Sequence, residues 1–277
     1  MIMLMSHIKK RRLAEYWTTI EVFETRGIRN LMSRDRFLQL LRLLHFSDNA
    51  RANEREGDRL KKIRPVLDHL RRKFSEKFKP FQDLCVDESL MLWRGRLSFR
   101  QYIPDKRHRF GIKLFVFCDA ETDYMLDFIV YTGKDTEIIT DNDLGISGSV
   151  VKTFLSPHLG KKHIVYFDNW YSSPKLLRFL SVNDTGACGT VRKDRKHMPK
   201  FAEMKKSESA SFNCKGILSM KWQDNRAVHM LSTVHEDKMI DCENKIRAGE
   251  IVRKPACVID YNKKMRIVDK NDMLISS

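Results

Sequence analysis

The chain has 277 residues, of which 42% are hydrophobic and 32% charged, a composition that excludes an intrinsically disordered protein. Lys and Arg total 52 against 36 Asp and Glu, giving a formal net charge of +16, and no stretch reaches the ~20 apolar residues of a membrane span. Such an excess of positive charge favours nucleic acid over a membrane or a small-molecule substrate as the partner. A basic surface that serves only solubility is the alternative.

The cysteines and the N-terminus bear on the cellular compartment. The six cysteines contain no C-x-x-C pair, which argues against a local zinc site and a disulfide framework and fits a reducing compartment. The basic run Lys9-Lys10-Arg11-Arg12 predicts a nuclear address and hence location in the nucleus. A solvated helix face is the alternative interpretation of so short a run.

Residues 1–80 are predicted to form a helical N-terminal region. Ser33 is a candidate N-cap for a helix with apolar residues on one face, namely Phe37, Leu40, Leu41 and Leu44. A second helix follows, and its apolar stripe consists of Ile63, Leu67, Leu70 and Phe74. We expect both stripes to be part of a hydrophobic core.

Residues 81–194 are predicted to form the first part of an α/β core. Strands are expected at 81–87, 112–118, 124–131, 163–168 and 187–192, with helices at 146–159 and 174–183. The second and third strands are predicted to pair as an antiparallel hairpin. This order indicates a mixed sheet with helices on its faces.

The remainder of the chain is predicted to contain an insertion and a last helix. Residues 195–250 contain strand-like runs at 217–222 and 228–234, and we expect a β-rich insertion that is not part of the main sheet. Residues 251–277 are predicted to form a truncated core helix from Tyr261 to about Met273.

Acidic residues at strand ends are the candidates for chemistry. Asp87 is predicted to end the first strand and Asp168 the fourth, while Asp269 and Asp272 share one face of the last helix. Phosphodiester chemistry needs such carboxylates around two Mg²⁺ ions ~3.5–4 Å apart. Spacing alone leaves Asp119 and Asp143 equally eligible, because Asp at a strand end is often a turn former.

A basic segment follows Asp87, with aromatic residues interleaved. We expect the cationic side chains to contact DNA phosphates, although an exposed hairpin with solvated charges is the alternative. The predicted DNA-contacting residues are Arg94, Arg96, Arg100, Lys106, Arg107, Arg109 and Lys113, with Lys193, Arg195 and Lys196 as a weaker second patch. The aromatic residues are expected to be core: Trp93, Phe99, Tyr102 and Phe110.

Several short motifs occur in a fixed order along the chain. They are Val86-Asp87-Glu88, Trp93-Arg94-Gly95-Arg96, Phe99-Arg100-Gln101-Tyr102-Ile103-Pro104-Asp105-Lys106, Phe167-Asp168-Asn169-Trp170-Tyr171-Ser172-Ser173 and Gly189-Thr190-Val191-Arg192. Together they resemble the piggyBac family of transposases and their host-domesticated derivatives, from about residue 8 to residue 273.

The resemblance implies an RNase-H-like fold, the core of a DDE transposase, with an insertion between the second and third Asp. Residue by residue, it assigns Asp87, Asp168 and Asp269 to the catalytic positions and Asp272 to an additional metal ligand. It further implies double-stranded DNA as the partner, Mg²⁺ as the cofactor with Mn²⁺ as a substitute, and cut-and-paste transposition. In that reaction water nicks a strand, the freed 3′-OH forms a hairpin, and the reopened end joins a TTAA target. A homodimer is one of the open alternatives for the oligomeric state.

The chain departs from the family pattern near the third Asp. The family usually has Gly-Gly where this chain has Arg266-Ile267, and active members continue into a Cys-rich domain where this chain has only Met273 to Ser277. One hypothesis is therefore a transposase impaired by a short C-terminus. The other is a domesticated, catalytically silent DNA-binding protein, for which the retention of all three Asp residues gives no support.

Overall fold

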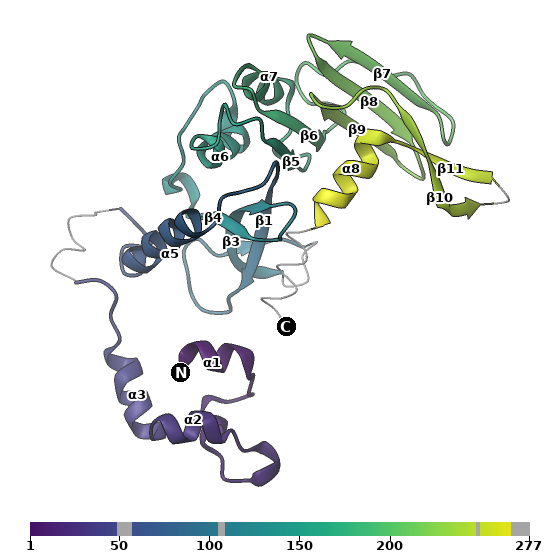
Figure 1. Cartoon of the computed structure of the whole chain (residues 1–277). Helices are drawn as coiled ribbons and strands as arrows, with labels where there is room; N and C mark the ends of the chain where they lie inside the picture. The colour runs from purple at the N-terminus through teal and green to yellow at the C-terminus, as the bar shows by residue number, and fades with distance from the viewer. Residues whose placement is uncertain (49–56, 105–108, 248–249, 267–277) are drawn as a thin grey trace. The chain divides into compact units, whose positions relative to one another are not determined.

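The computed structural model describes residues 1–48, 57–104, 109–247 and 250–266 (Figure 1). The chain divides into two compact units, Met1–Leu67 and Asp68–Ser277. The division falls within α5 (Arg64–Lys77) rather than near residue 80, because the later part of this helix packs into the second unit. There, Phe74 makes edge-to-face ring contacts with Tyr124 and Phe128.

The first unit is helical over its described residues. It contains α1 (Ile2–His7), the short 3₁₀ helices η1 (Leu13–Trp17) and η2 (Glu21–Phe23), α2 (Arg26–Leu31) and α3 (Arg34–Leu43). The Ser33 hydroxyl caps α3 by accepting a hydrogen bond from the Arg36 backbone N–H at 3.4 Å. The predicted apolar stripe of α3 is wrong in part: Phe37 is buried, against Trp17, but Leu40, Leu41 and Leu44 are exposed. The unit is too small to cover a full helix face.

The second unit is built on a mixed nine-stranded sheet, counted over the described residues. Its order is β2-β3-β1-β5-β6-β9-β8-β7, and β4 also pairs with β3. The strands are β1 (Asp83–Leu92), β2 (Gln101–Tyr102), β3 (Phe110–Asp119), β4 (Met125–Val130), β5 (Ile164–Phe167), β6 (Gly186–Thr190), β7 (Ser209–Cys214), β8 (Ile217–Gln223) and β9 (Ala227–Ser232). Strands β1, β5 and β6 are mutually parallel, and the other pairs are antiparallel. This confirms the predicted mixed α/β fold of the RNase-H-like kind.

The predicted insertion is β-rich, but the expectation that it is not part of the main sheet is wrong for β7, β8 and β9. Strand β9 pairs with β6, with Cys188 opposite Ser232, so the three strands extend the main sheet. Without β9, that edge of β6 would present unpaired backbone N–H and C=O groups. Only β10 (Met239–Arg247) and β11 (Glu250–Pro255) form a separate two-stranded sheet.

Helices cover both faces of the sheet, and the alternation along β1 and β5 shows which face is which. One face, with Val86 and Phe167, packs against α6 (Gly145–Leu155) and α7 (Pro174–Val182). The other face, with Cys85 and Tyr166, packs against α8 (Ala256–Lys264) and the residue after it, Met265. The sequence predicts the last helix from Tyr261, five residues later than it begins; its predicted end lies outside the described residues.

The structure bears on two expectations drawn from composition, the state of the cysteines and the ability of the helices to span a membrane. The described residues include all six cysteines and contain no disulfide bond, and four of the cysteines are buried: Cys85, Cys118, Cys188 and Cys257. In the part of the chain that the structure describes, no helix is both long enough and apolar enough to cross a lipid bilayer.

Candidate active site

Two acidic residues meet at one end of the parallel strands. The β1–β5 ladder ends with Val86 opposite Phe167, and Asp87 and Asp168 are the next residues on the two strands. The prediction that Asp87 ends its strand is wrong, because β1 continues to Leu92 and Asp87 pairs with Val116 of β3. The parallel pairing of β1 with β5, however, ends at Val86, directly before Asp87. Both carboxylates therefore lie where the parallel ladder opens.

Both carboxylates also face the same helix. Side chains two residues apart on a strand share a face, and the residues two before the acids are Cys85 and Tyr166, which pack on the α8 side. The Cys85 thiol contacts the Met265 sulfur at 3.3 Å, and the Tyr166 hydroxyl donates to Asp260 of α8. Asp87 of β1 and Asp168, the residue directly after β5, thus lie at the same end of the parallel ladder and on the α8 side of the sheet.

Tyr261 of α8 links the last helix to this pair. Burial is the largest cause of the raised pKa of Tyr261, and the negative charges of Asp168 and Asp87 raise it further. Its hydroxyl lies 3.4 Å from Thr190 Oγ1 at the end of β6. Helix α8 consequently lies close enough to both carboxylates for its tyrosine to respond to their charge. Asp269 and Asp272, which follow this helix in the sequence, lie outside the described residues.

The negative charge of the Asp168 carboxylate is poorly compensated by its surroundings. Burial is the largest cause of its raised pKa, and the nearby charge of Glu88 adds to it. The Trp170 backbone N–H, which donates to Asp168 Oδ1 at 2.9 Å, and the charge of Lys113 act in the opposite direction. A buried carboxylate with a raised pKa has too little positive charge around it, and an added cation would stabilise its ionised form.

Lys113 lies beside the acids rather than on an open surface. Its Nζ is 3.7 Å from Glu88 Oε2 and about equally far from two rings, at 4.9 Å from the Trp170 centroid and 5.0 Å from that of Phe115. These rings stack on each other with centroids 5.6 Å apart. Only 16% of the Lys113 side chain is exposed. The aromatic rings therefore hold this charge next to Glu88 and Asp168.

Tyr171 is a buried aromatic residue in the core cluster that includes residues of α6 and α7. Tyr171 is 1% exposed, and within the described residues its hydroxyl has no hydrogen-bond partner. Its pKa is raised well above the ordinary value, first by burial and then by the charges of Asp87, Glu88 and Asp168. Carboxylate oxygens such as those of Asp87 and Asp168 are the hard donors that Mg²⁺ prefers. The two Asp carboxylates fit such an ion, although no set of three His, Cys, Asp or Glu side chains suited to a metal occurs among the described residues.

Arg195 holds the turn that follows Asp168. Its Nη2 donates to the backbone carbonyls of Asn169 at 2.6 Å and of Trp170 at 3.0 Å, and Arg192 Nε donates to the Asn169 side chain at 3.3 Å. Burial is the main cause of the lowered pKa of Arg195. The sequence suggested only a weak DNA patch here. No local pattern could show the positioning role, because Arg195 and Asn169 are brought together by the fold.

Asp119 and Asp143, the two alternative candidates from the sequence, have other roles. Asp119 is fully buried, and its carboxylate accepts hydrogen bonds from the Phe81 N–H at 2.7 Å and from the Thr122 N–H and hydroxyl at 2.9 and 2.8 Å. It stabilises the β3–β4 turn. Asp143 has an 87% exposed side chain and forms an ion pair with Lys175 at 3.0 Å. Neither residue is part of the Asp87–Asp168 site.

Apart from Lys113, the predicted basic track is exposed where the structure describes it. Arg94, Arg96, Arg100, Arg109 and Lys193 are all exposed, whereas Lys106 and Arg107 lie outside the described residues. The aromatic residues differ from the prediction: Phe99 is buried, but Trp93, Tyr102 and Phe110 are 41–54% exposed. Part of the reason is that β2 is an edge strand: its Tyr102 ring packs on the Phe110 ring of β3, 4.8 Å away, and the Arg100 guanidinium lies 5.2 Å from the Phe110 ring centroid.

A mixed sheet with two carboxylates on neighbouring parallel strands, enclosed by helices on both faces, defines a protein of the RNase-H-like class. A family model described as Transposase IS4 matches residues 1–277. Within that class the chain belongs to the piggyBac family of transposases and transposase-derived proteins.

The relatives are similar over nearly all of this chain. Human PiggyBac transposable element-derived protein 3 is 30% identical over 98% of the chain and 47% of its own length. Human PiggyBac transposable element-derived protein 2 is 25% identical over 99% of the chain and 48% of its own length. The cryo-EM structure of a piggyBac transposase synaptic complex with hairpin DNA matches with a TM-score of 0.80 and 27% identity, over 99% of this chain and 57% of that one. The chain thus spans about half the length of these relatives.

Proposed function

We propose that the chain carries a divalent-metal site for cleavage and strand transfer of double-stranded DNA. The observation that carries this proposal is the position of Asp87 and Asp168, side by side where the β1–β5 ladder opens and facing α8. Asp269 and Asp272 are proposed to complete the metal-binding set, as the resemblance to the family implies.

The residues around the pair have distinct proposed roles. Asp87 and Asp168 would bind Mg²⁺, or Mn²⁺ in its place, and the ion would supply Lewis-acid activation of the attacking and leaving oxygens. Lys113 balances the charge of Glu88 and Asp168, since it is held between them and the aromatic rings. Arg195 keeps Asp168 in position through the Asn169–Trp170 carbonyls.

DNA binding is supported by charge and by the exposed basic track. The net charge of +16 attracts a polyanion, and Arg94, Arg96, Arg100 and Arg109 follow Asp87 closely in the chain. The structural relative is a piggyBac transposase in a synaptic complex with hairpin DNA. We extend DNA binding to this chain as a proposal. The proposal includes location in the nucleus, which the basic run from Lys9 to Arg12 suggests.

A plasmid-nicking assay tests the proposed function. The unaltered chain should nick supercoiled DNA in Mg²⁺, and Asp168→Asn should abolish nicking. Asp143→Asn is the matched control, since it removes an exposed carboxylate remote from the pair. Nicking that survives Asp168→Asn would contradict the assignment.

The second candidate function is sequence-tolerant DNA binding without cleavage. The observation that favours it is the replacement of the family's Gly-Gly by Arg266-Ile267 before the third Asp, because Gly adopts conformations that Arg and Ile resist. DNA binding with no nicking by the unaltered chain, in Mg²⁺ or Mn²⁺, would support this second function.

A further inference from the structure

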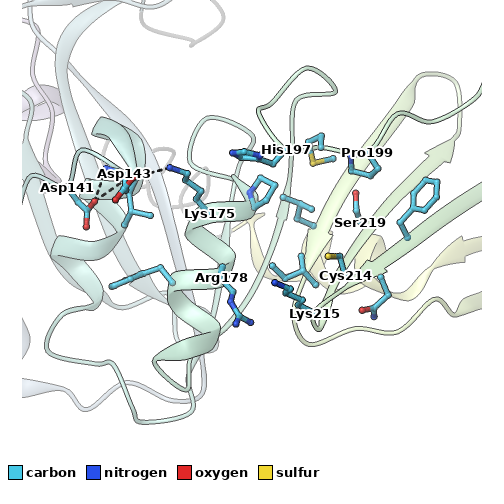
Figure 2. A pocket seen from close by; sticks show the side chains of 17 residues that line it. Asp141, Asp143, Lys175, Arg178, His197, Pro199, Cys214, Lys215 and Ser219 are labelled. Atoms are coloured by element: carbon cyan, nitrogen blue, oxygen red, sulfur yellow. Dashed lines mark hydrogen bonds and ion pairs between the residues drawn. The ribbon is translucent and has the colours of Figure 1, made fainter.

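A large cleft lies apart from the acidic pair. It has a volume of about 1110 Å³ and is lined by residues of α7, of the segment around 141–144, of the 197–199 loop and of the β7–β8 hairpin. Figure 2 shows Lys175 and Arg178 on the helix wall, and Cys214, Lys215 and Ser219 on the sheet wall. Asp87 and Asp168 do not line it. Its size is at the upper end of ordinary ligand pockets.

The floor and one wall of the cleft are apolar. Phe179, Met198, Ile217 and Leu231 line it together with Phe212, whose side chain is 50% exposed. The Phe212 ring contacts the Phe201 ring in a tilted arrangement, with centroids 5.2 Å apart. Phe212 therefore offers a partly exposed aromatic ring, in contact with a neighbouring ring, to a ligand.

The sheet wall ends in a tight and rigid turn. Cys214 pairs with Ile217, so the hairpin loop consists only of Lys215 and Gly216, with φ angles of +51° and +79°. This is the conformation of a two-residue β-hairpin turn, which favours Gly at its second position. The turn fixes Lys215 at the rim of the cleft.

Two cations at the cleft lack acidic partners. Lys175 is balanced by Asp143 at 3.0 Å, but neither Arg178 nor Lys215 forms an ion pair within the part of the chain that the structure describes. Figure 2 places Arg178 and Lys215 on opposite walls. An anionic group between them would be attracted from both sides.

Ser219 supplies an independent indication of a ligand. Its side chain lines the cleft, it is 6% exposed, and its hydroxyl has no hydrogen-bond partner among the described residues. A buried hydroxyl without a partner is costly and rare in folded proteins. A polar group of a bound molecule would satisfy it.

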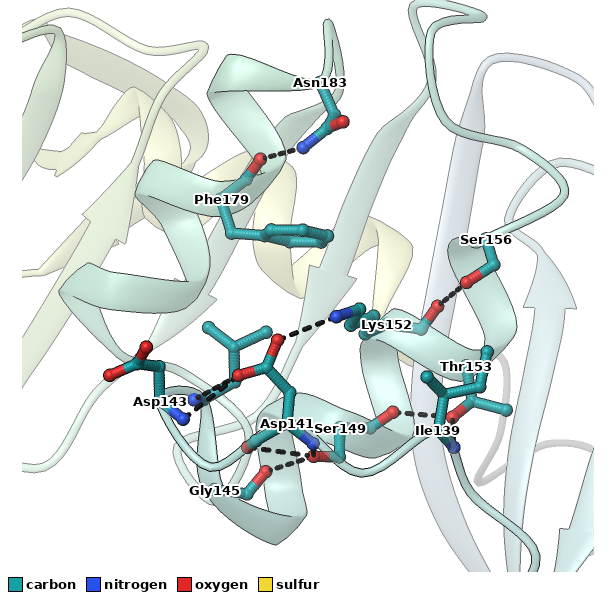
Figure 3. Close-up of polar contacts among 11 residues, drawn as sticks. Ile139, Asp141, Asp143, Gly145, Ser149, Lys152, Thr153, Ser156, Phe179 and Asn183 are labelled. Carbon is teal, nitrogen blue, oxygen red and sulfur yellow. Dashed lines mark hydrogen bonds and ion pairs between the residues drawn. The ribbon is translucent and has the colours of Figure 1, made fainter.

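The remaining wall is already ordered without a ligand. The Asp141 carboxylate accepts hydrogen bonds from Lys152 Nζ at 2.7 Å and from the Asp143 N–H at 3.0 Å, as Figure 3 shows. The Ser149 hydroxyl donates to the Gly145 carbonyl at 2.7 Å, and Lys152 Nζ lies 5.5 Å from the Phe179 ring centroid. A preformed wall lowers the entropic cost of binding.

We infer that this cleft binds one unpaired nucleotide of a DNA strand. The base would stack on Phe212 and reach the Ser219 hydroxyl with its polar edge, and the phosphate would lie between Arg178 and Lys215. An aromatic base joined to an anion matches the apolar wall, the buried hydroxyl and the unpaired cations together. The inference rests on the proposed DNA binding and assigns it a second contact site.

Photo-cross-linking locates the nucleotide. The probe is a single-stranded oligothymidylate of about ten nucleotides with one 5-iodouracil, bound in EDTA so that no metal-dependent cleavage occurs. Cross-links should map by mass spectrometry to peptides containing Met198 or Phe212. The bound strand should also protect the exposed Cys214 thiol from alkylation, with Cys242 as the internal reference.

Variants separate the cleft from general charge attraction. Phe212→Ala should lower the affinity for the oligothymidylate, measured by fluorescence anisotropy, about tenfold, within the range for loss of one base–aromatic stack. Ser219→Ala should lower it by a smaller factor, since it removes one small group. Arg178→Ala with Lys215→Ala should lower it more than Lys162→Ala with Lys206→Ala, which removes the same charge from exposed residues outside the cleft lining.

Duplex binding, measured in parallel, distinguishes this inference from the proposed function. Phe212→Ala should bind duplex DNA as the unaltered chain does. Cross-links that map elsewhere, an unprotected Cys214, or equal decreases in both double variants would overturn the inference while duplex binding stands. An acidic apolar peptide that protects Cys214 when the oligonucleotide does not would also overturn it. Failure to bind duplex DNA at all would instead contradict the proposed function.

Discussion

Asp87 and Asp168 directly follow Val86 and Phe167, the last paired residues of the parallel β1–β5 ladder. The two carboxylates therefore emerge side by side, although β1 and β5 are separated in the sequence by three further strands, a short 3₁₀ helix and α6. Burial raises the pKa of Asp168, which is the direction expected of a carboxylate that awaits a cation.

Removing the Asp168 charge should stabilise the metal-free protein. The pKa of Asp168 is raised in the folded state, so the folded protein holds this proton more tightly than the unfolded chain does. Stability from this group is then present at low pH and is lost as pH rises between the ordinary and the raised pKa. At neutral pH, Asp168→Asn should raise Tm in EDTA, measured by differential scanning fluorimetry. A lower Tm would show that the ionised carboxylate is already compensated.

Asp119 should behave in the opposite way. Its buried carboxylate accepts hydrogen bonds from Phe81 and Thr122, so Asp119→Ala leaves those donors unsatisfied. We expect a decrease in stability of about 3 kcal/mol or more and a fall in Tm of roughly 6–12 °C. Urea unfolding gives the free energy directly. A decrease below about 1 kcal/mol would mean that water replaces the carboxylate, and would reopen the question of its role.

The basic track predicts a steep salt dependence of DNA binding. Arg94→Ala, Arg96→Ala and Arg100→Ala together should weaken binding to all duplex sequences alike. They should also reduce the slope of log K against log salt by about 0.9 for each DNA phosphate that the variant no longer neutralises. The matched control removes three exposed lysines elsewhere, Lys134, Lys162 and Lys206. Fluorescence anisotropy at several salt concentrations measures both, and equal slopes for the two triple variants would place the track elsewhere.

Arg195 is expected to act through Asp168 rather than on the ligand itself. Arg195→Ala frees the Asn169 and Trp170 carbonyls and should lower affinity for Mn²⁺ by about tenfold, as removal of supporting groups around metal ligands does. Lys193→Ala, an exposed neighbour, should leave it unchanged. Arg195→Lys should restore part of the affinity. An unchanged Mn²⁺ dissociation constant in Arg195→Ala would limit this residue to a structural role.

Much of the second unit could be predicted from local patterns, because short apolar runs that end in a polar residue are visible in the sequence. The strands before Asp87 and Asp168 are of this kind. Pairings between distant segments were not visible. The β6–β9 ladder joins Cys188 to Ser232, and no local signal distinguishes a strand that extends a sheet from one that stands apart.

Prediction of the site from local sequence patterns has the same limit. That acidic residues follow two core strands could be predicted, but their common face depends on the sheet register and on the packing of α8. The contact of Arg195 with the turn after Asp168 required the fold. The exposure of Tyr102 and Phe110 was missed because aromatic residues usually indicate core, whereas Tyr102 lies on the edge strand β2 and Phe110 lies in the part of β3 that pairs with it.

The central claim is that Asp87 and Asp168 bind one divalent cation together, and isothermal titration of the chain with Mn²⁺ tests it most directly. The account predicts saturable binding that is lost in Asp87→Asn and in Asp168→Asn but kept in Asp143→Asn. Bound metal should also stabilise the fold, by ~2.7 kcal/mol at a hundredfold excess over its dissociation constant. Saturable binding that survives both substitutions, or no binding by the unaltered chain, would contradict the account.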